Sequence, residues 1–198
     1  MARTPTQQGR HFMGKLYDAI DEKLQAFIAK QKMFFVATAP LSPGGHINLS
    51  PKGYDAFRIL GPKRVAYADL GGSGIETVAH ARENGRVTIM FCAFEGPAMI
   101  LRLYGKATVI QFDEPGFDKE LARFPGFERA RNIVFIDVDR VADSCGWGVP
   151  FYDFKSERDQ LKRAIDHLPH DQLNEKRYTG NAESIDGLTG LVRVTAAL

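Results

Sequence analysis

The sequence predicts a mainly β protein of the α+β class, with six or seven antiparallel strands and short helices around them. Three observations support this prediction. Short segments rich in β-branched and aromatic residues follow one another across turns that contain Gly or Pro, which is typical of hairpins. The sequence lacks a regular alternation of strands with long helices, which argues against a doubly wound parallel sheet. Gly105 falls inside a long strand, where a bulge or bend is expected, so a small closed or half-closed barrel is favoured.

The first part of the chain contains one helix and two hairpins. Leu16, Ile20, Leu24 and Ile28 recur at helical spacing with charged residues between them, which predicts an amphipathic helix. Two pairs of strands follow, and each pair is joined by a turn that contains Gly and Pro. The expected strands are 33–39 with 46–50, and 56–60 with 64–70.

The middle of the chain combines long strands with short helices. A helix over 75–84 is expected to end at Gly85. The next segment, 86–94, is so apolar that burial on both of its faces is expected. The remaining elements expected here are strands over 99–112 and 132–144 with a short helix over 114–124 between them.

The composition of the sequence changes after residue 145, where an aromatic, glycine-rich loop begins. Ser156 is a good N-cap for a helix over 156–168, and 171–178 adds a further turn or two. We therefore expect three parts: a polar tail over 1–12, a barrel domain over 13–145, and a C-terminal loop and helical extension over 146–198 that packs on the barrel or on a dimer partner.

Composition argues for a soluble globular protein and against several classes of function. The 198 residues carry a net charge of +2 with scattered basic residues, so the charge gives no case for nucleic-acid binding. No segment approaches the roughly 20 apolar residues of a membrane span, and the N-terminus lacks the apolar run of a signal peptide. We therefore expect a cytoplasmic protein without membrane association.

Cysteine and histidine spacing gives no sign of a metal site. Cys92 and Cys145 fit neither a metal motif nor a CxxC pair and are expected to be free thiols, although whether either is reactive stays open. The five histidines show no ligand spacing, so no metal is expected.

The stretch from 46 to 77 carries the features that indicate a ligand site. One strand ends in Ser50-Pro51-Lys52-Gly53, where polar groups replace the apolar alternation. A second stretch, "YADLGGSGIET" (67–77), runs from the end of a strand through glycines into a helix N-terminus, whose unpaired N–H groups and dipole favour phosphate. Either these are two ordinary loops, or they present Lys52, backbone amides and hydroxyls to one bound anion.

Sequence motifs in this region resemble a known family. "KGYD" (52–55), followed by a hairpin and "YADLGGS" (67–73), resembles the flavin-binding stretch of the pyridoxamine 5′-phosphate oxidase-like family. "VTIMFCAFEGPAMILRLYGKATVI" is similar to the family's next pair of strands, and "SCGWGVPFYDF" and "SIDGLTGL" resemble the C-terminal part of a bacterial branch. The resemblance covers residues 20 to 195 and implies a split β-barrel homodimer with FMN in a cleft between the subunits.

The resemblance also implies which residues bind FMN. They are Asn48, Leu49 and Ser50 at the edge of the ring, Lys52 at the ribityl phosphate, Tyr67, Ala68 and Asp69 beside the flavin, Ser73, Gly74, Ile75, Glu76 and Thr77 at the phosphate, and Arg102 at the phosphate or the partner subunit. Trp147 either covers a flavin face or a planar substrate, or anchors its loop to the core or the partner.

The chain departs from the family's oxidases in the phosphate loop. The oxidases often carry Ser-Arg-Lys where this chain reads Ser73-Gly74-Ile75. The positive charge for a phosphate is therefore expected from Lys52 and helix amides, with His80 or Arg82 as further candidates. The oxidases' C-terminal basic residues for substrate find no match here, which argues against pyridoxine phosphate as the substrate.

The function implied by the resemblance is that of an FMN-dependent oxidoreductase acting on a small molecule, with the cofactor supplying the electron chemistry. The alternatives are a non-catalytic protein of the same fold that holds flavin, deazaflavin or haem, and a dimeric scaffold with a vestigial cleft. A G-x-S-x-G nucleophile motif is absent from the sequence, so acyl transfer has no support. The substrate, the electron donor and the catalytic residues stay open.

Overall fold

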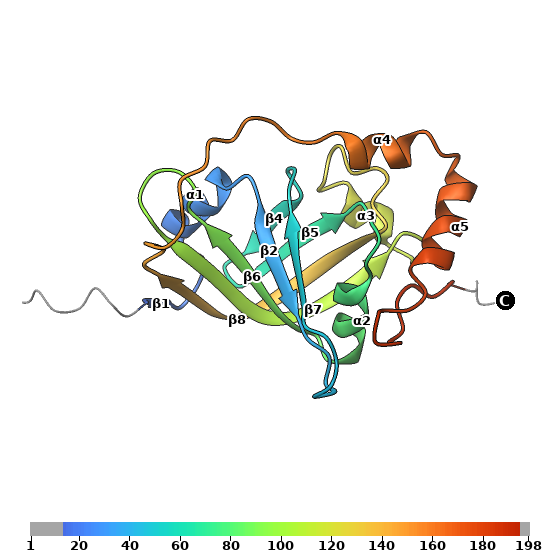
Figure 1. Cartoon of the computed structure of the whole chain (residues 1–198), viewed down its shortest axis with the longest axis horizontal. Helices are drawn as coiled ribbons and strands as arrows, with labels where there is room; N and C mark the ends of the chain where they lie inside the picture. Colours follow the sequence, from blue (N-terminus) through green and yellow to red (C-terminus); the bar gives the residue numbers. More distant parts are fainter. Residues whose placement is uncertain (1–13, 195–198) are drawn as a thin grey trace, which may run out of the picture.

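The computed structural model describes residues 14–194, which form one strongly curved antiparallel sheet of eight strands with short helices around it (Figure 1). The strands follow the order β3-β2-β6-β7-β8-β5-β4, and β1 pairs with β8 outside this path. The strands are β1 (Leu16–Tyr17), β2 (Phe34–Thr38), β3 (Asn48–Lys52), β4 (Phe57–Gly61), β5 (Arg64–Asp69), β6 (Arg86–Cys92), β7 (Ile100–Gln111) and β8 (Asn132–Ser144). The helices are α1 (Glu22–Lys30), α2 (Glu76–Glu83), α3 (Phe117–Leu121), α4 (Gln160–Asp166) and α5 (His170–Gly180).

The predicted fold class is confirmed: the protein is mainly antiparallel β, a split barrel with short peripheral helices. The two-residue strand β1 adds one strand to the six or seven expected. The polar tail predicted for 1–12 lies outside the described residues.

The predicted irregularity at Gly105 is a bulge between β7 and β8. The register of the two strands shifts between Tyr104 and Gly105. A Cβ atom at Gly105 would lie 2.1 Å from the carbonyl oxygen of Asp137, so no larger residue fits without movement of the backbone. The bulge bends the two longest strands of the sheet, which lets the sheet curl around its core.

The core lies inside the curl of the sheet and is filled by alternate side chains of strands such as β2 and β6, while β5 is buried along both of its faces. Phe34, Phe57, Tyr67 and Phe91 meet there with ring centroids 5.1 to 5.8 Å apart. The expectation that 86–94 is buried on both faces is wrong. Buried and half-buried residues alternate along β6, because only one face of the sheet is turned to the core.

The first helix begins later than its apolar spacing predicts. Asp21 is the N-cap of α1, and its Oδ1 accepts a hydrogen bond of 2.9 Å from the amide of Leu24. Leu16 and Tyr17 instead pair with Ala142 and Val141 of β8. A capping aspartate in the middle of the pattern therefore decides where the helix starts.

The C-terminal segment passes over one end of the barrel before its two helices (Figure 1). The helix predicted from Ser156 starts four residues later, at Gln160, with Asp159 as its N-cap residue. Ile165 of α4 and Leu173 of α5 join the main core, and Leu191 packs with Ile75 at the start of α2. The C-terminal segment thus lies directly against the region of the predicted phosphate loop.

Candidate functional site

The site forms where β3 and the connection from β5 to α2 lie side by side. β5 ends at Asp69, and Gly71 takes a φ of +94°, which an L side chain rarely adopts. The chain then enters α2 through Ile75, whose apolar side chain cannot accept a hydrogen bond from the first turn. The amide of Val78 donates to the carbonyl of Ile75 at 2.9 Å, so in this turn the N–H groups of Glu76 and Thr77 are the ones that can serve an external acceptor.

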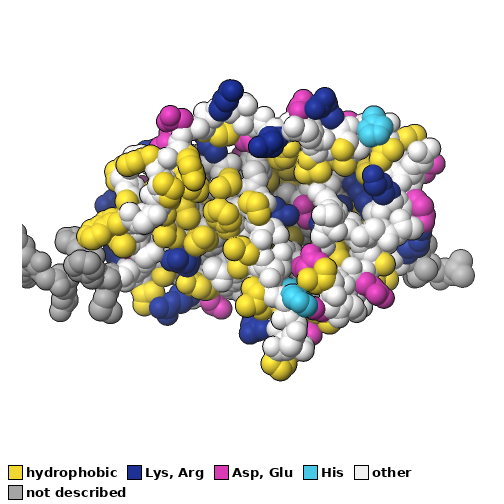
Figure 2. Space-filling view, viewed as in Figure 1, with side chains coloured by type: hydrophobic (Ala, Val, Ile, Leu, Met, Phe, Trp, Pro, Cys, Tyr) yellow, Lys and Arg dark blue, Asp and Glu magenta, His cyan; other side chains and the backbone are white. Residues whose placement is uncertain are grey.

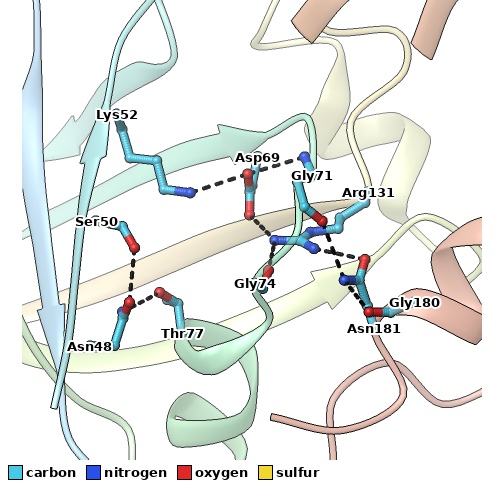
Figure 3. Close-up of polar contacts among 11 residues, drawn as sticks. Asn48, Ser50, Lys52, Asp69, Gly71, Gly74, Thr77, Arg131, Gly180 and Asn181 are labelled. Atoms are coloured by element: carbon cyan, nitrogen blue, oxygen red, sulfur yellow. Dashed lines mark hydrogen bonds and ion pairs between the residues drawn. The ribbon is translucent and has the colours of Figure 1, made fainter. Parts of the chain in front are cut away.

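A cavity of about 100 Å³ opens between these segments. Its lining contains several residues predicted from the sequence: Asn48, Ser50, Lys52, Asp69, Gly74, Glu76 and Thr77. Gly71, Gly72 and Arg131 complete it. The two stretches that sequence analysis treated as either ordinary loops or one site therefore line one cavity (Figure 3).

Asp69 is the charged centre of the cavity wall. Its Oδ1 lies 3.3 Å from Lys52 Nζ and accepts the amide of Gly71 at 3.2 Å, while its Oδ2 lies 2.9 Å from Arg131 Nη2. Burial by itself would raise the pKa of Asp69, but Arg131 and then Lys52 outweigh it, so the pKa lies below its ordinary value. Asp69 is therefore ionised in the fold and holds both cations in place.

A neutral hydrogen-bond network forms the β3 side of the cavity. Ser50 Oγ donates to Asn48 Oδ1 at 2.8 Å, and Asn48 Nδ2 donates to the hydroxyls of Thr38 and Thr77, each at 3.0 Å. Thr38 Oγ1 in turn lies 2.9 Å from Nδ1 of His80, which is fully buried. Burial lowers the pKa of His80 below its ordinary value. The network fixes the side chains of Asn48 and Ser50 toward the cavity.

Arg131 is the charged residue of the cavity that the sequence analysis does not predict. It lies directly before β8, where its amide donates to the carbonyl of Asp69 at 2.8 Å. Its side chain lies beside the segment 71–74 between β5 and α2, which we call the glycine loop. It donates to the carbonyl of Gly74 at 2.8 Å and to Oδ1 of Asn181 at 2.8 Å (Figure 3). Arg131 reaches the cavity because Asp69 of β5 pairs with Asn132 of β8. This pairing joins segments far apart in the sequence, so a local sequence pattern does not reveal it.

The two further cations suggested from the sequence lie outside this cavity. His80 is enclosed below Thr38, and Arg82 donates to Gln111 at 2.6 Å and approaches Glu114 at 3.9 Å. Both residues therefore contact the body of the fold, and neither side chain reaches the N-terminal end of α2. Arg131 supplies the second cation instead.

Other predicted residues lie close to the cavity but do not line it. Leu49 points to the opposite face of β3 and is 63% exposed, because side chains alternate along a strand. Tyr67, Ala68 and Ile75 are buried in the core. Burial and the charge of Asp69 raise the pKa of Tyr67. Ser73 is exposed on the glycine loop.

Arg102 and Trp147 lie apart from the cavity. Arg102 is in β7, where its Nη1 donates to Ser144 Oγ at 3.0 Å, and Trp147 is 65% exposed on the loop after β8. Their expected roles at a flavin face or a partner subunit stay predictions. Both free cysteines are confirmed, with Cys92 buried and Cys145 exposed.

A second, larger hollow of about 1760 Å³ lies between α1 and the segment 152–158. Pro51, Gly53 and Tyr54 contribute to its lining, so β3 and the turn after it separate the two hollows. Tyr54 Oη donates to the carbonyl of Arg158 at 2.5 Å, which ties the C-terminal segment across this end of the barrel.

Comparison with known proteins identifies the family. The family model described as Pyridoxamine 5'-phosphate oxidase matches residues 20–143, which include β3, the glycine loop and Arg131. The chain belongs to this family. A relative in Aspergillus flavus, the pyridoxamine 5'-phosphate oxidase family protein ustO, is 36% identical over 192 residues, covering 88% of this chain and 77% of the relative.

Solved structures of similar proteins are more distant from this family member. HupZ of Group A Streptococcus is 23% identical with a TM-score of 0.47, covering 62% of this chain and 91% of that chain. An FMN-binding protein of Syntrophomonas wolfei is 14% identical with a TM-score of 0.45, covering 59% of this chain and 79% of that chain.

Within 14–194, no helix has the length and apolarity that crossing a bilayer requires. The same span contains no group of three or more His, Cys, Asp or Glu side chains placed to hold a metal ion.

Proposed function

We propose that this family member binds FMN and acts as an FMN-dependent oxidoreductase on a small molecule. The observation that carries the proposal is the cavity at the start of α2. Lys52, Arg131, the glycine loop and the hydroxyl of Thr77 all face this one space. Cations, backbone amides at a helix N-terminus and hydroxyls are together the donor set that a phosphate monoester requires.

The residues present fit a phosphate group in kind and in size. A cavity of about 100 Å³ accommodates a phosphate but not a three-ring system. The carboxylate of Glu76 lies against Gly74, where a Cβ atom would be 2.5 Å from its Oε2, and this flexible side chain can move to admit a ligand. We propose that Lys52 binds the phosphate and that Asn48 and Ser50, next along β3, supply hydrogen bonds to the flavin.

FMN, when bound, supplies the hydride and electron transfer. The protein's own part is to bind and orient it. Lys52 is already held at the cavity by Asp69, and Asn48 is held by Thr38 and Thr77, so both side chains are placed before the ligand arrives. Such preorganisation reduces the entropy that binding costs.

The alternative function is flavin binding without turnover, and one observation favours it. Among the described residues around the cavity, Asp69 has a lowered pKa and Tyr67 a raised one. Neither side chain is therefore poised to move a proton near neutral pH.

We further propose that the protein is a homodimer. Ile47, Leu49, Trp147, Phe151 and Tyr152 are large apolar or aromatic side chains that are strongly exposed. Figure 2 shows hydrophobic side chains gathered on the face over β2, β6 and β7. Large exposed apolar patches are uncommon on monomers and mark interaction surfaces.

Titration of the purified protein with FMN tests the function. We expect micromolar or tighter binding, seen as quenching of flavin fluorescence, followed by reduction of the bound flavin by NADH or NADPH under anaerobic conditions. Bound FMN that neither donor reduces would favour the alternative of a carrier. A protein that does not bind FMN would contradict both.

A further inference from the structure

Arg131 lies beneath the glycine loop in a position from which it can control that loop. Its side chain is almost fully buried, and its Nη2 is bonded both to Asp69 and to the main-chain carbonyl of Gly74. Within residues 14–194, its Nε is buried without a hydrogen-bond partner. Arg131 also lines the cavity itself, so a buried cation borders the proposed phosphate position.

The charges that line the cavity balance only because of Arg131. Lys52 and Arg131 are positive, and Asp69 and Glu76 are negative. Without Arg131, two carboxylates would face one ammonium group, and the cavity would carry a net negative charge. A dianionic phosphate would then be repelled at short range, where the surroundings screen charge poorly.

The end of α5 holds Arg131 and the loop together. Asn181, the C-cap residue of α5, accepts from Arg131 Nη1 and donates through Nδ2 to the carbonyl of Gly72 at 3.4 Å. Arg131 therefore binds the carbonyl of Gly74 and Asn181 binds that of Gly72, and the two side chains are hydrogen-bonded to each other. Figure 3 shows Arg131 between Gly74 and Asn181. In a trans peptide the next N–H points opposite to the carbonyl, so the amides of Ser73 and Ile75 are turned away from Arg131.

We infer that Arg131 and Asn181 form a clamp that positions the glycine loop for the phosphate of FMN and supplies the positive charge that the loop itself lacks. The inference rests on the proposed function, because it assigns residues to the same site. It makes Arg131 a positioning residue and gives the C-terminal segment a part in cofactor binding. It also explains how Ser73-Gly74-Ile75 can serve without a cation of its own.

Comparing FMN with riboflavin, which lacks the phosphate, isolates the role of the clamp. We expect Arg131→Met in the full chain to lower FMN affinity at least about tenfold and to leave riboflavin affinity unchanged, because the cavity loses one positive charge and the glycine loop loses its support. Asn181→Ala keeps every charge and should lower FMN affinity by a smaller factor, again without an effect on riboflavin. Dissociation constants from fluorescence quenching give both ratios.

Arg129→Met is the matched control. Arg129 donates to the carbonyls of Ile165 and Leu168, so it also anchors the C-terminal segment, but it does not line the cavity. It should leave the preference for FMN over riboflavin unchanged. Circular dichroism and thermal unfolding show whether each variant folds.

Three results would overturn the inference. The first is an Arg131→Met variant that keeps the wild-type preference for FMN. The second is an equal loss for both ligands, which would assign Arg131 to the fold alone. The third applies if Arg131→Met does not fold: an Asn181→Ala variant that keeps the wild-type preference for FMN over riboflavin. A wild type that binds neither ligand contradicts the proposed function and the inference with it, whereas binding of FMN with no effect of the variants contradicts the clamp alone.

Discussion

Lys52 and Asp69 form an ion pair across the small cavity, with Lys52 Nζ 3.3 Å from Asp69 Oδ1. Lys52 is the last residue of β3 and Asp69 the last of β5, two strands that do not pair with each other. The ion pair therefore links two strands that are not neighbours in the sheet. Because Asp69 also binds Arg131, an anion in the cavity meets two cations that are already fixed in place.

Replacement of Asp69 by Asn should destabilise the protein and change its response to acid. The variant leaves Arg131 buried without its carboxylate, which typically costs about 3 kcal/mol of unfolding free energy at pH 7. The pKa of Asp69 in the fold lies below the ordinary 3.8, so the unfolded chain binds more protons than the folded one. Its contribution is fully present above pH 3.8 and is lost progressively as the pH falls below 3.8 toward the lower pKa of the folded state.

Urea unfolding between pH 7 and pH 3 measures both effects. The wild type should lose stability toward pH 3 more steeply than Asp69→Asn. Parallel curves for the two proteins would mean that Asp69 has no lowered pKa in the fold.

Gly105→Ala should destabilise the barrel. The added methyl would lie 2.1 Å from the carbonyl oxygen of Asp137, so β7 and β8 must separate at the bulge. We expect a loss of about 2 to 4 kcal/mol, as for other strained backbone positions, measured by chemical denaturation. Gly61→Ala is the control, because a Cβ atom there meets nothing within 4 Å among the described residues. Equal stability of the two variants would count against the bulge.

Much of the fold follows from local sequence. The strand over 132–144 was predicted with the bounds that the structure has, since a long run of β-branched and apolar residues is an unambiguous signal. Lys52 follows from the polar end of an apolar strand, whereas Asp69 follows from the resemblance to the family. The sequence also allows the side-chain direction of Leu49 to be predicted, because side chains alternate along β3 and Leu49 therefore points away from the face of Asn48 and Ser50.

Arg131 could not be predicted in the same way. Arg129 and Arg131 stand two residues apart in similar surroundings, yet only Arg131 turns under the glycine loop. The difference depends on the pairing of β8 with β5 and on the position of Asn181, which are both long-range features. Sequence reasoning therefore found most of the residues that line the cavity and missed the buried Arg131.

Leu49→Lys should weaken the proposed homodimer. Leu49 is 63% exposed on the outer face of β3, and a lysine there would bring a charge into an apolar interface. Sedimentation equilibrium should give a dimer for the wild type and a shift toward monomer for the variant. Leu41→Lys is the matched control, because Leu41 is 62% exposed but lies in the turn between β2 and β3. A monomeric wild type would refute the dimer.

The affinity of Lys52→Ala for FMN tests the central claim most directly, because Lys52 is the proposed phosphate ligand. Lys63→Ala removes an exposed lysine from the turn between β4 and β5 and controls for net charge. We predict that Lys52→Ala lowers FMN affinity about tenfold or more, the usual effect of losing a charge-assisted hydrogen bond, while Lys63→Ala binds FMN like the wild type. Unchanged FMN affinity in Lys52→Ala would contradict the assignment of this cavity to the phosphate.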